Sequence, residues 1–181
     1  MVMNIPRTFI LASMISLALI TATSVTSMPT LSYAQNKFSA NLNGAGVFPP
    51  TTKQTNATGK AELGLVNNGQ VMKYNISALS GSVKPANVNT VVITHSTGGR
   101  STDLVSLRSA TQQGLTGPKT SGSLVGNFTS KDITGGGNIV GFKTHDMPSL
   151  VKDILSGNVY VKVGTVNFPL GAIGGKLKSG P

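Results

Sequence analysis

Apolar and polar side chains alternate in short runs along most of the chain, which is the pattern of half-buried β-strands. The clearest run is Gln70–Leu79, in which every second residue is apolar and should face a core. The residues of that apolar face are Met72, Tyr74, Ile76 and Ala78. A second alternating run, Lys60–Val66, precedes it, with Asn68-Gly69 in between. Asn-Gly suits a type I′ turn, so we predict a hairpin from Lys60 to Leu79.

Further short strands are predicted throughout the rest of the chain. They are Lys37–Leu42, Val88–Thr94, Leu104–Leu107, Ser123–Thr129, Asn138–Phe142, Val159–Val163 and Ala172–Lys178. The continuous apolar run Val91–Ile93 is typical of a central strand that is covered on both faces. The 22 glycines and 9 prolines interrupt any long helical pattern.

One segment has helical spacing. Asp146 can cap a helix whose first turn holds Pro148, and Gly157 is placed to end it. We therefore predict an all-β fold, an immunoglobulin-like or Greek-key β-sandwich or a barrel, with one short helix at 148–156 that plugs one end.

The first 34 residues have the features of a secretory signal. Arg7 gives a short basic start, Phe9–Ile20 is an uncharged apolar core, and Ser32–Ala34 has the small-x-small form of a cleavage site. We predict cleavage after Ala34, which leaves one β domain over residues 35–181. The alternative is an uncleaved anchor, since Thr8–Met28 is about long enough to span a bilayer. Either way the protein is expected to be secreted or at the cell surface, with membrane contact only through this segment.

The amino-acid composition excludes several kinds of functional site. The chain has no cysteine, which excludes thiolate nucleophiles, zinc–thiolate sites and iron–sulfur ligation. Its formal net charge is +10, and without Arg7 it is 14 − 5 = +9. The basic residues are scattered and are not interleaved with aromatic ones, which argues against nucleic-acid binding. Attraction to an anionic surface polymer remains consistent with this charge.

No catalytic or metal site emerges from the sequence. His95 and His145 are the only histidines, whereas zinc or copper sites need three or four protein ligands, so neither a metal nor another cofactor is predicted. A Ser96–His95–Asp103 triad fails because strand neighbours point to opposite faces. The five carboxylates show no spacing that would make a catalytic pair. The protein is therefore predicted not to be an enzyme.

The best candidate for binding is the segment Ser96–Asp103, interpreted as a turn. It is polar and rich in glycine, and loops on a rigid sandwich often carry recognition. The candidate residues are Ser96, Thr97, Arg100 and Asp103, with Arg100 as the main charged contact. The alternative is a mobile hairpin tip that only connects two strands.

Three blocks of sequence resemble one family. They are Leu42–Pro50 with Ala57–Ala61, then Thr90–Gly99, and finally Leu155–Thr165 with Phe168–Leu177. In this order they are similar to the chordin-type (CHRD) domain family, with the last block the most specific. The chain is identified as a divergent member.

The departures from the family pattern concern polar residues. Gly164, Ala172, Gly174 and Lys176 stand where the family has His, Glu, Arg and Gln, and Val47 replaces an acidic residue. The resemblance thus implies a retained framework without the family's polar groups. We expect no tight metal binding and no hydrolysis from this face.

Together these observations predict an extracellular or cell-surface binding or structural module. Its partner would be an unidentified extracellular protein or an anionic surface polymer. The alternative is an exported metal-dependent or hydrolytic enzyme. A third possibility, a non-specific polyanion-binding coat component, rests on net charge alone. Neither ligand identity nor oligomeric state follows from the sequence.

Overall fold

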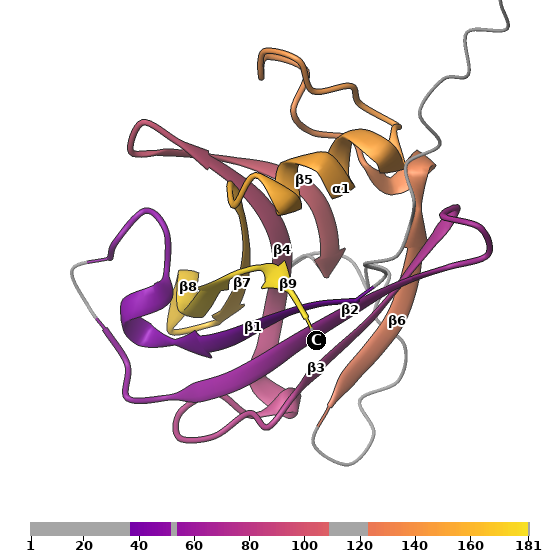
Figure 1. The fold of residues 1–181 in the computed structure, drawn as a ribbon. Helices are drawn as coiled ribbons and strands as arrows, with labels where there is room; N and C mark the ends of the chain where they lie inside the picture. The colour runs from indigo at the N-terminus through magenta and orange to yellow at the C-terminus, as the bar shows by residue number, and fades with distance from the viewer. Residues whose placement is uncertain (1–36, 52–53, 109–122, 181) are drawn as a thin grey trace, which may run out of the picture. The chain divides into compact units, whose positions relative to one another are not determined.

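The computed structural model describes residues 37–51, 54–108 and 123–180, which form an antiparallel β-sheet with one α-helix (Figure 1). The strands are β1 (Lys37–Asn43), β2 (Thr58–Val66), β3 (Val71–Ser77), β4 (Val88–Thr97), β5 (Arg100–Arg108), β6 (Leu124–Thr129), β7 (Val159–Thr165), β8 (Phe168–Lys176) and β9 (Lys178–Ser179). The helix is α1 (Met147–Leu155). Three short 3₁₀ turns are η1 (Gly44–Gly46), η2 (Pro85–Asn87) and η3 (Ser130–Asp132).

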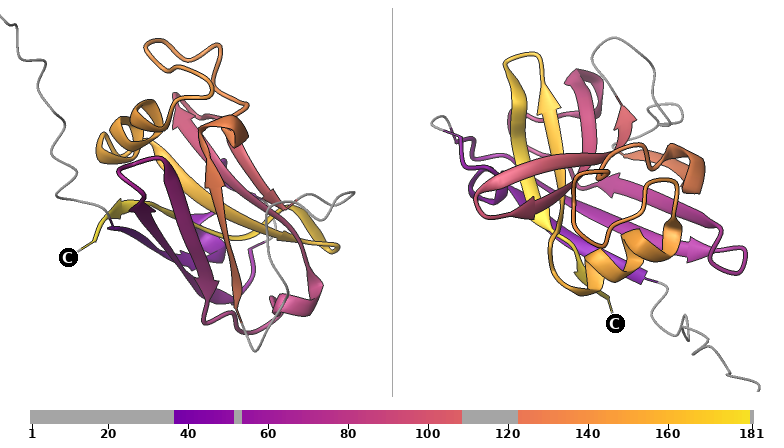
Figure 2. Two further views of the ribbon diagram at one scale, coloured as in Figure 1. Left: turned by 90° about the vertical axis from the view of Figure 1, so that its right-hand side faces the viewer. Right: turned by 90° about the horizontal axis from the view of Figure 1, so that it is seen from above.

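The strand order is β5-β4-β7-β8-β1-β2-β3-β6, and β9 pairs with β1. The sheet curls, so that the layer containing β1, β2, β3 and β6 packs across the core from the layer containing β4, β5 and β7 (Figures 1 and 2). This arrangement confirms the predicted all-β class with one short helix.

The two end strands of this order, β5 and β6, are connected through the segment that follows β6. Thr134 and Gly135 both donate backbone hydrogen bonds, of 3.1 Å each, to the Leu104 carbonyl in β5. A Cβ on Gly135 would lie 1.7 Å from the Asp103 carbonyl oxygen, so only glycine permits this approach. The first two glycines of the run at 135–137, which was interpreted from the sequence as a flexible turn, therefore pack directly against β5.

The predicted hairpin at 60–79 is confirmed as β2 and β3, but its turn lies one residue earlier than expected. Asn67 and Asn68 both have positive φ, 52° and 53°, and the Gly69 amide donates to the Val66 carbonyl at 3.2 Å. Asparagine tolerates this left-handed conformation, so Asn67-Asn68 takes the centre of the turn. Ala78 was predicted to share the apolar face, but it has φ 51° and is exposed beyond the end of β3.

The core follows the predicted alternation. Tyr74 and Ile76 are 3% and 0% exposed. The largest fully buried side chains are Phe38, Phe128, Leu42, Met72, Ile76, Ile93, Leu104, Leu107, Leu124, Ile133, Met147 and Leu150. In β4, Val91 and Ile93 are buried whereas Val92 is only partly buried, so the expectation of cover on both faces was wrong there.

One predicted strand does not form. Asn138–Phe142 is a pair of tight turns, with hydrogen bonds from Ile139 to the Gly136 carbonyl and from Phe142 to the Ile139 carbonyl. Gly136 and Gly141 have φ of 90° and 78°, which bends the backbone away from an extended path. The apolar pair Ile139-Val140 had suggested a strand, but turn geometry decides the conformation.

Helix α1 matches its prediction. The Asp146 side chain accepts a 2.9 Å hydrogen bond from the Ser149 amide, and Gly157 follows the helix with φ 73°. The helix buries Met147, Leu150, Val151 and Ile154 against the sheet. Within residues 37–51, 54–108 and 123–180, no helix has the length and apolar character needed to cross a bilayer. The predicted signal at 1–34 lies outside the described residues.

The ends of the described domain lie beside each other. β9 pairs antiparallel with the start of β1, with Phe38 opposite Ser179, and the Gly180 amide donates to the Lys37 carbonyl at 2.8 Å. The first and last strands are thereby hydrogen-bonded together.

Candidate functional site

The segment predicted as the binding turn is mostly β-hairpin. Strands β4 and β5 stay paired to their ends, with Ser96 opposite Ser101 and Thr97 opposite Arg100. Only Gly98 and Gly99 form the turn, with φ of 60° and 80°. The expectation of a longer loop at 96–103 was wrong because polar strand residues beyond the core resemble a loop in sequence. The paired strands thus define the backbone positions from which these side chains project.

Strand alternation divides the candidate residues between two faces. Thr97 and Arg100 lie on the same face as His95 and Thr102, and all four line one pocket. Ser96 and Asp103 do not line it, and Asp103 lies 3.9 Å from Lys162 in an ion pair. The structure therefore brings together Thr97 and Arg100 and separates Ser96 and Asp103 from them.

A hydrogen-bonded chain of side chains runs along one wall of this pocket. Nδ1 of His95 lies 2.7 Å from Oδ2 of Asp153 on α1, and Nε2 of His95 is hydrogen-bonded to the Thr97 hydroxyl. The other carboxylate oxygen of Asp153 accepts a 3.2 Å hydrogen bond from the Asn158 side-chain amide. The side chains of His95 and Asp153 are 8% and 10% exposed, so this pair is nearly buried.

Backbone hydrogen bonds connect the elements that carry these hydrogen-bonded side chains. The Ser96 amide donates to the Asn158 carbonyl at 2.8 Å, and the Asn158 amide donates to the Asp153 carbonyl at 3.2 Å. The end of α1, the start of β7 and the end of β4 are therefore linked around His95. The inner face of β4, which carries Val91 and Ile93 in the core, continues past the core edge as the wall of the pocket.

The pocket has a volume of about 530 Å³, within the range of small-molecule sites. It lies between the β4–β5 hairpin, the turns at 138–142 and the outer side of α1, which gather at one end of the domain (Figure 2). Ile139 and Phe142 are partly buried against the core and form its apolar wall. Val140 in the same turns is fully exposed.

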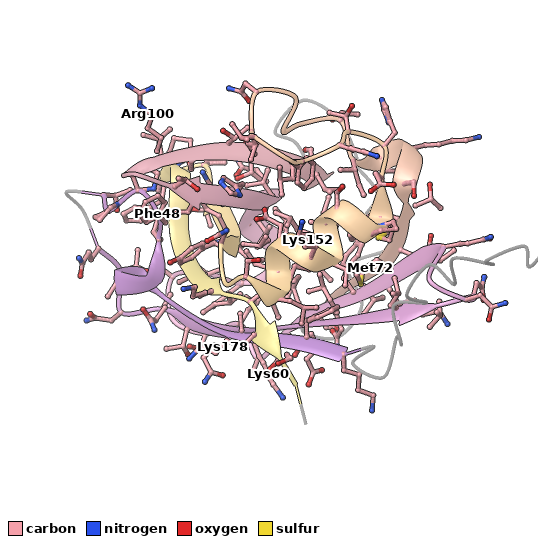
Figure 3. All side chains as sticks on the ribbon, turned by 45° about the horizontal axis from the view of Figure 1, so that its top comes forward. Phe48, Lys60, Met72, Arg100, Lys152 and Lys178 are labelled. Carbon is pink, nitrogen blue, oxygen red and sulfur yellow. The ribbon has the colours of Figure 1, made fainter. Side chains whose placement is uncertain are left out.

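The cationic groups of the pocket come from two sides. Arg100 projects from the tip of the hairpin and Lys152 lies on α1 (Figure 3). The carboxylate of Asp153 is paired with His95, and no ion pair of Arg100 or Lys152 occurs among the described side chains. The pocket thus combines two available cations, several hydroxyl and amide groups, and one apolar wall.

The positions where the family's polar residues are missing do not form an opening. A Cβ on Gly174 would lie 2.8 Å from the Gly46 carbonyl oxygen, and one on Gly164 would lie 2.1 Å from Oγ1 of Thr90. Ala172 is buried, and the Lys176 ammonium lies 5.9 Å from the centre of the Tyr160 ring. Backbone and neighbouring side chains occupy this region in place of the absent groups.

Metal ligands do not cluster in the part of the chain that the structure describes: no three His, Asp or Glu side chains come together there. His145 lies apart from His95, and its Nδ1 is 3.1 Å from the Lys131 carbonyl oxygen. Asp146 is the helix cap, as predicted.

Of the residues that line the pocket, sequence reasoning predicted only Thr97 and Arg100 as binding residues, and it missed Lys152, Asp153 and Asn158 among others. Asp153 is 58 residues from His95 along the chain, and no local pattern links the two. Two sequence features could have indicated the pocket. His95 and Thr97 are spaced i, i+2 and so share one strand face, and the helix was predicted to cover an end of the sheet.

The fold and pocket define a class of protein, an all-β domain that presents a polar, cationic pocket at one end of a curled sheet. A family model for the CHRD domain matches residues 38–177, and the chain belongs to this family. Comparison with curated proteins and with solved structures found no match.

Proposed function

We propose that this protein is an exported or cell-surface binding module that holds an anionic group of an extracellular partner in the pocket beside Arg100. The observation that carries the proposal is that Arg100 on β5 and Lys152 on α1 line one pocket, both without an acidic partner among the described residues. CHRD domains are generally extracellular, which is consistent with the predicted signal segment. An arginine fork can bind a carboxylate or phosphate through two hydrogen bonds.

The test uses the mature chain and two acidic polymers, alginate and dextran sulfate, in physiological salt. Arg100→Ala should weaken binding about tenfold or more, because hydrogen bonds to charged groups contribute roughly 1.5–3 kcal/mol. Lys73→Ala is the charge-matched control, since Lys73 is exposed on β3 and does not line the pocket. Equal affinity of Arg100→Ala and the unaltered protein would reject the pocket as the binding site.

The Lys73→Ala control also distinguishes binding in the pocket from non-specific binding of polyanions by surface lysines. Lys60 and Lys178 lie on the far side of the sheet from α1 (Figure 3), and Lys37 and Lys73 line a second groove with Lys60. If binding depends on Lys73 as much as on Arg100 and falls steeply with salt, the protein is a general polyanion binder.

A second candidate function is supported by the Thr97–His95–Asp153 chain, which has the order hydroxyl, imidazole, carboxylate found in hydrolases. The CHRD domain is not a known enzyme family. Acyl transfer also needs preorganised donors for the oxyanion, and the cationic donors here, Arg100 and Lys152, are long and flexible. Release of p-nitrophenol from p-nitrophenyl acetate that disappears in Thr97→Val would favour this function.

A further inference from the structure

The hydrogen-bonded chain through His95 has a direction, and this direction determines which ligand groups fit beside Thr97. A carboxylate has no proton to donate, so Nδ1 of His95 donates to Asp153. If the imidazole is neutral, Nε2 is an acceptor and the Thr97 hydroxyl donates to it, and this is the arrangement on which the inference is built. In this arrangement the single hydroxyl proton of Thr97 is already used in the bond to His95.

Thr97 consequently faces the pocket as a hydrogen-bond acceptor. The ligand group beside it must bring a donor, such as a hydroxyl. Since each bond in the chain polarises the next, the Thr97 oxygen is a better acceptor than an isolated hydroxyl. Arg100, directly opposite Thr97 in the hairpin, has only donors and requires an acceptor.

Directly opposed residues in an antiparallel pair have Cβ atoms about 4.5–5.5 Å apart. The guanidinium lies at the end of a long side chain, so a ligand that satisfies Thr97 and Arg100 together has a hydroxyl and an anionic oxygen group on one framework, separated by no more than the reach of that side chain. The wall formed by Ile139 and Phe142 adds an apolar surface against which the C–H face of a ring can pack.

We infer that the pocket binds a hexuronic acid unit of an acidic polysaccharide, with the carboxylate on Arg100 and a ring hydroxyl donating to Thr97. Planar carboxylate matches the arginine fork, and sugar hydroxyls supply the donor that Thr97 requires. The inference rests on the proposed function and specifies its ligand class.

The experiment measures affinities of the mature protein by calorimetry for three probes. They are trigalacturonate, its neutral methyl ester and an oligoacrylate of equal charge, which has carboxylates but no hydroxyls. Trigalacturonate should bind at least about tenfold more tightly than the methyl ester and about fivefold more tightly than oligoacrylate, as expected for losing a charged or a neutral hydrogen bond.

Three variants locate the contact. Thr97→Val keeps the side-chain shape, removes the acceptor and should reduce trigalacturonate affinity about fivefold while leaving oligoacrylate unchanged. Thr97→Ser should restore affinity, and Ser96→Ala, on the other face of the strand, should have no effect. Circular dichroism and thermal unfolding check that each variant is folded.

Asp153→Asn tests the direction of the chain. Asn158 donates to Oδ1, so the new amide keeps its oxygen there and turns its NH₂ toward His95. Nδ1 then accepts, Nε2 donates, and the Thr97 proton becomes free. The preference for trigalacturonate over its fully O-methylated form, which can only accept at its hydroxyl positions, should shrink in this variant.

The outcomes distinguish this inference from the proposed function. Equal binding of trigalacturonate and oligoacrylate, unaffected by Thr97→Val but lost in Arg100→Ala, overturns the uronic acid assignment and keeps an anion-binding pocket. Binding that is indifferent to both Thr97 and Arg100 overturns both proposals.

Discussion

Tyr74 shows how a single buried polar group affects this domain. Its ring lies in the core, 6.4 Å from that of Phe128 between centroids, and its hydroxyl has no hydrogen-bond partner among the described residues. Burial without a partner disfavours the charged phenolate, which raises the pKa of Tyr74 above its ordinary value. The unpaired hydroxyl thus lowers the stability of the fold, and packing of the buried ring offsets this loss.

We predict that Tyr74→Phe stabilises the protein by about 1 kcal/mol at neutral pH, because an unsatisfied buried hydroxyl is removed. The pH dependence has a defined sign. A tyrosine in the unfolded chain ionises near pH 10, whereas Tyr74 in the fold stays protonated there. Ionisation therefore favours the unfolded state above about pH 10, so the free energy of unfolding is unaffected by Tyr74 below that pH and falls above it.

Urea unfolding of both proteins between pH 7 and pH 11 measures these two effects. The stability advantage of Tyr74→Phe should increase above about pH 10, since only the unaltered protein has this ionisation. A loss of more than about 1 kcal/mol at pH 7 would instead mean that the hydroxyl makes a stabilising hydrogen bond.

Some of the pocket residues could be predicted from the sequence and others could not. Arg100 and Thr97 could be selected because a polar, glycine-rich stretch between two apolar runs is visible locally. Asp153 could not be selected, since its partner His95 is 58 residues away and only the docking of α1 brings them together. Long-range contacts of this kind depend on the complete packing of the domain.

At the scale of elements, local patterns determined most of the fold. The alternation in β3 and the cap at Asp146 are local patterns, so β3 formed as predicted apart from Ala78, and α1 formed within one residue of its predicted ends. The turns at 138–142 were mistaken for a strand because apolar content outweighed the flanking glycines in the pattern. The pairing of β1 with both β8 and β9 had no local signal.

We predict that Ile76→Ala in β3 destabilises the domain by about 2–5 kcal/mol, the usual range for truncating a fully buried aliphatic side chain. Chemical unfolding monitored by circular dichroism gives the value. Val125→Ala on the neighbouring β6 is a suitable control, because Val125 is 39% exposed and should change stability by less than about 0.5 kcal/mol. Similar effects for both variants would contradict the core position of Ile76.

For the whole molecule, we predict that a signal segment precedes the CHRD domain, whose family model matches residues 38–177. We predict that the mature protein begins at Gln35. Intact mass spectrometry of protein recovered from the exported fraction should give the mass of residues 35–181. Recovery of the full chain from the membrane fraction would support the uncleaved anchor instead.

The pairing of β9 with the start of β1 has a consequence for the entropy of the unfolded chain. The Gly180 amide and the Lys37 carbonyl are 2.8 Å apart, so a very short peptide could join the two ends into a ring without disturbing either strand. Such a ring encloses 180 − 37 + 1 = 144 native residues. In the unfolded state, closing a loop of this size removes chain freedom equivalent to about 4–5 kcal/mol in the simplest model. The native fold already holds its ends together, so it would gain stability from this closure at little cost in strain.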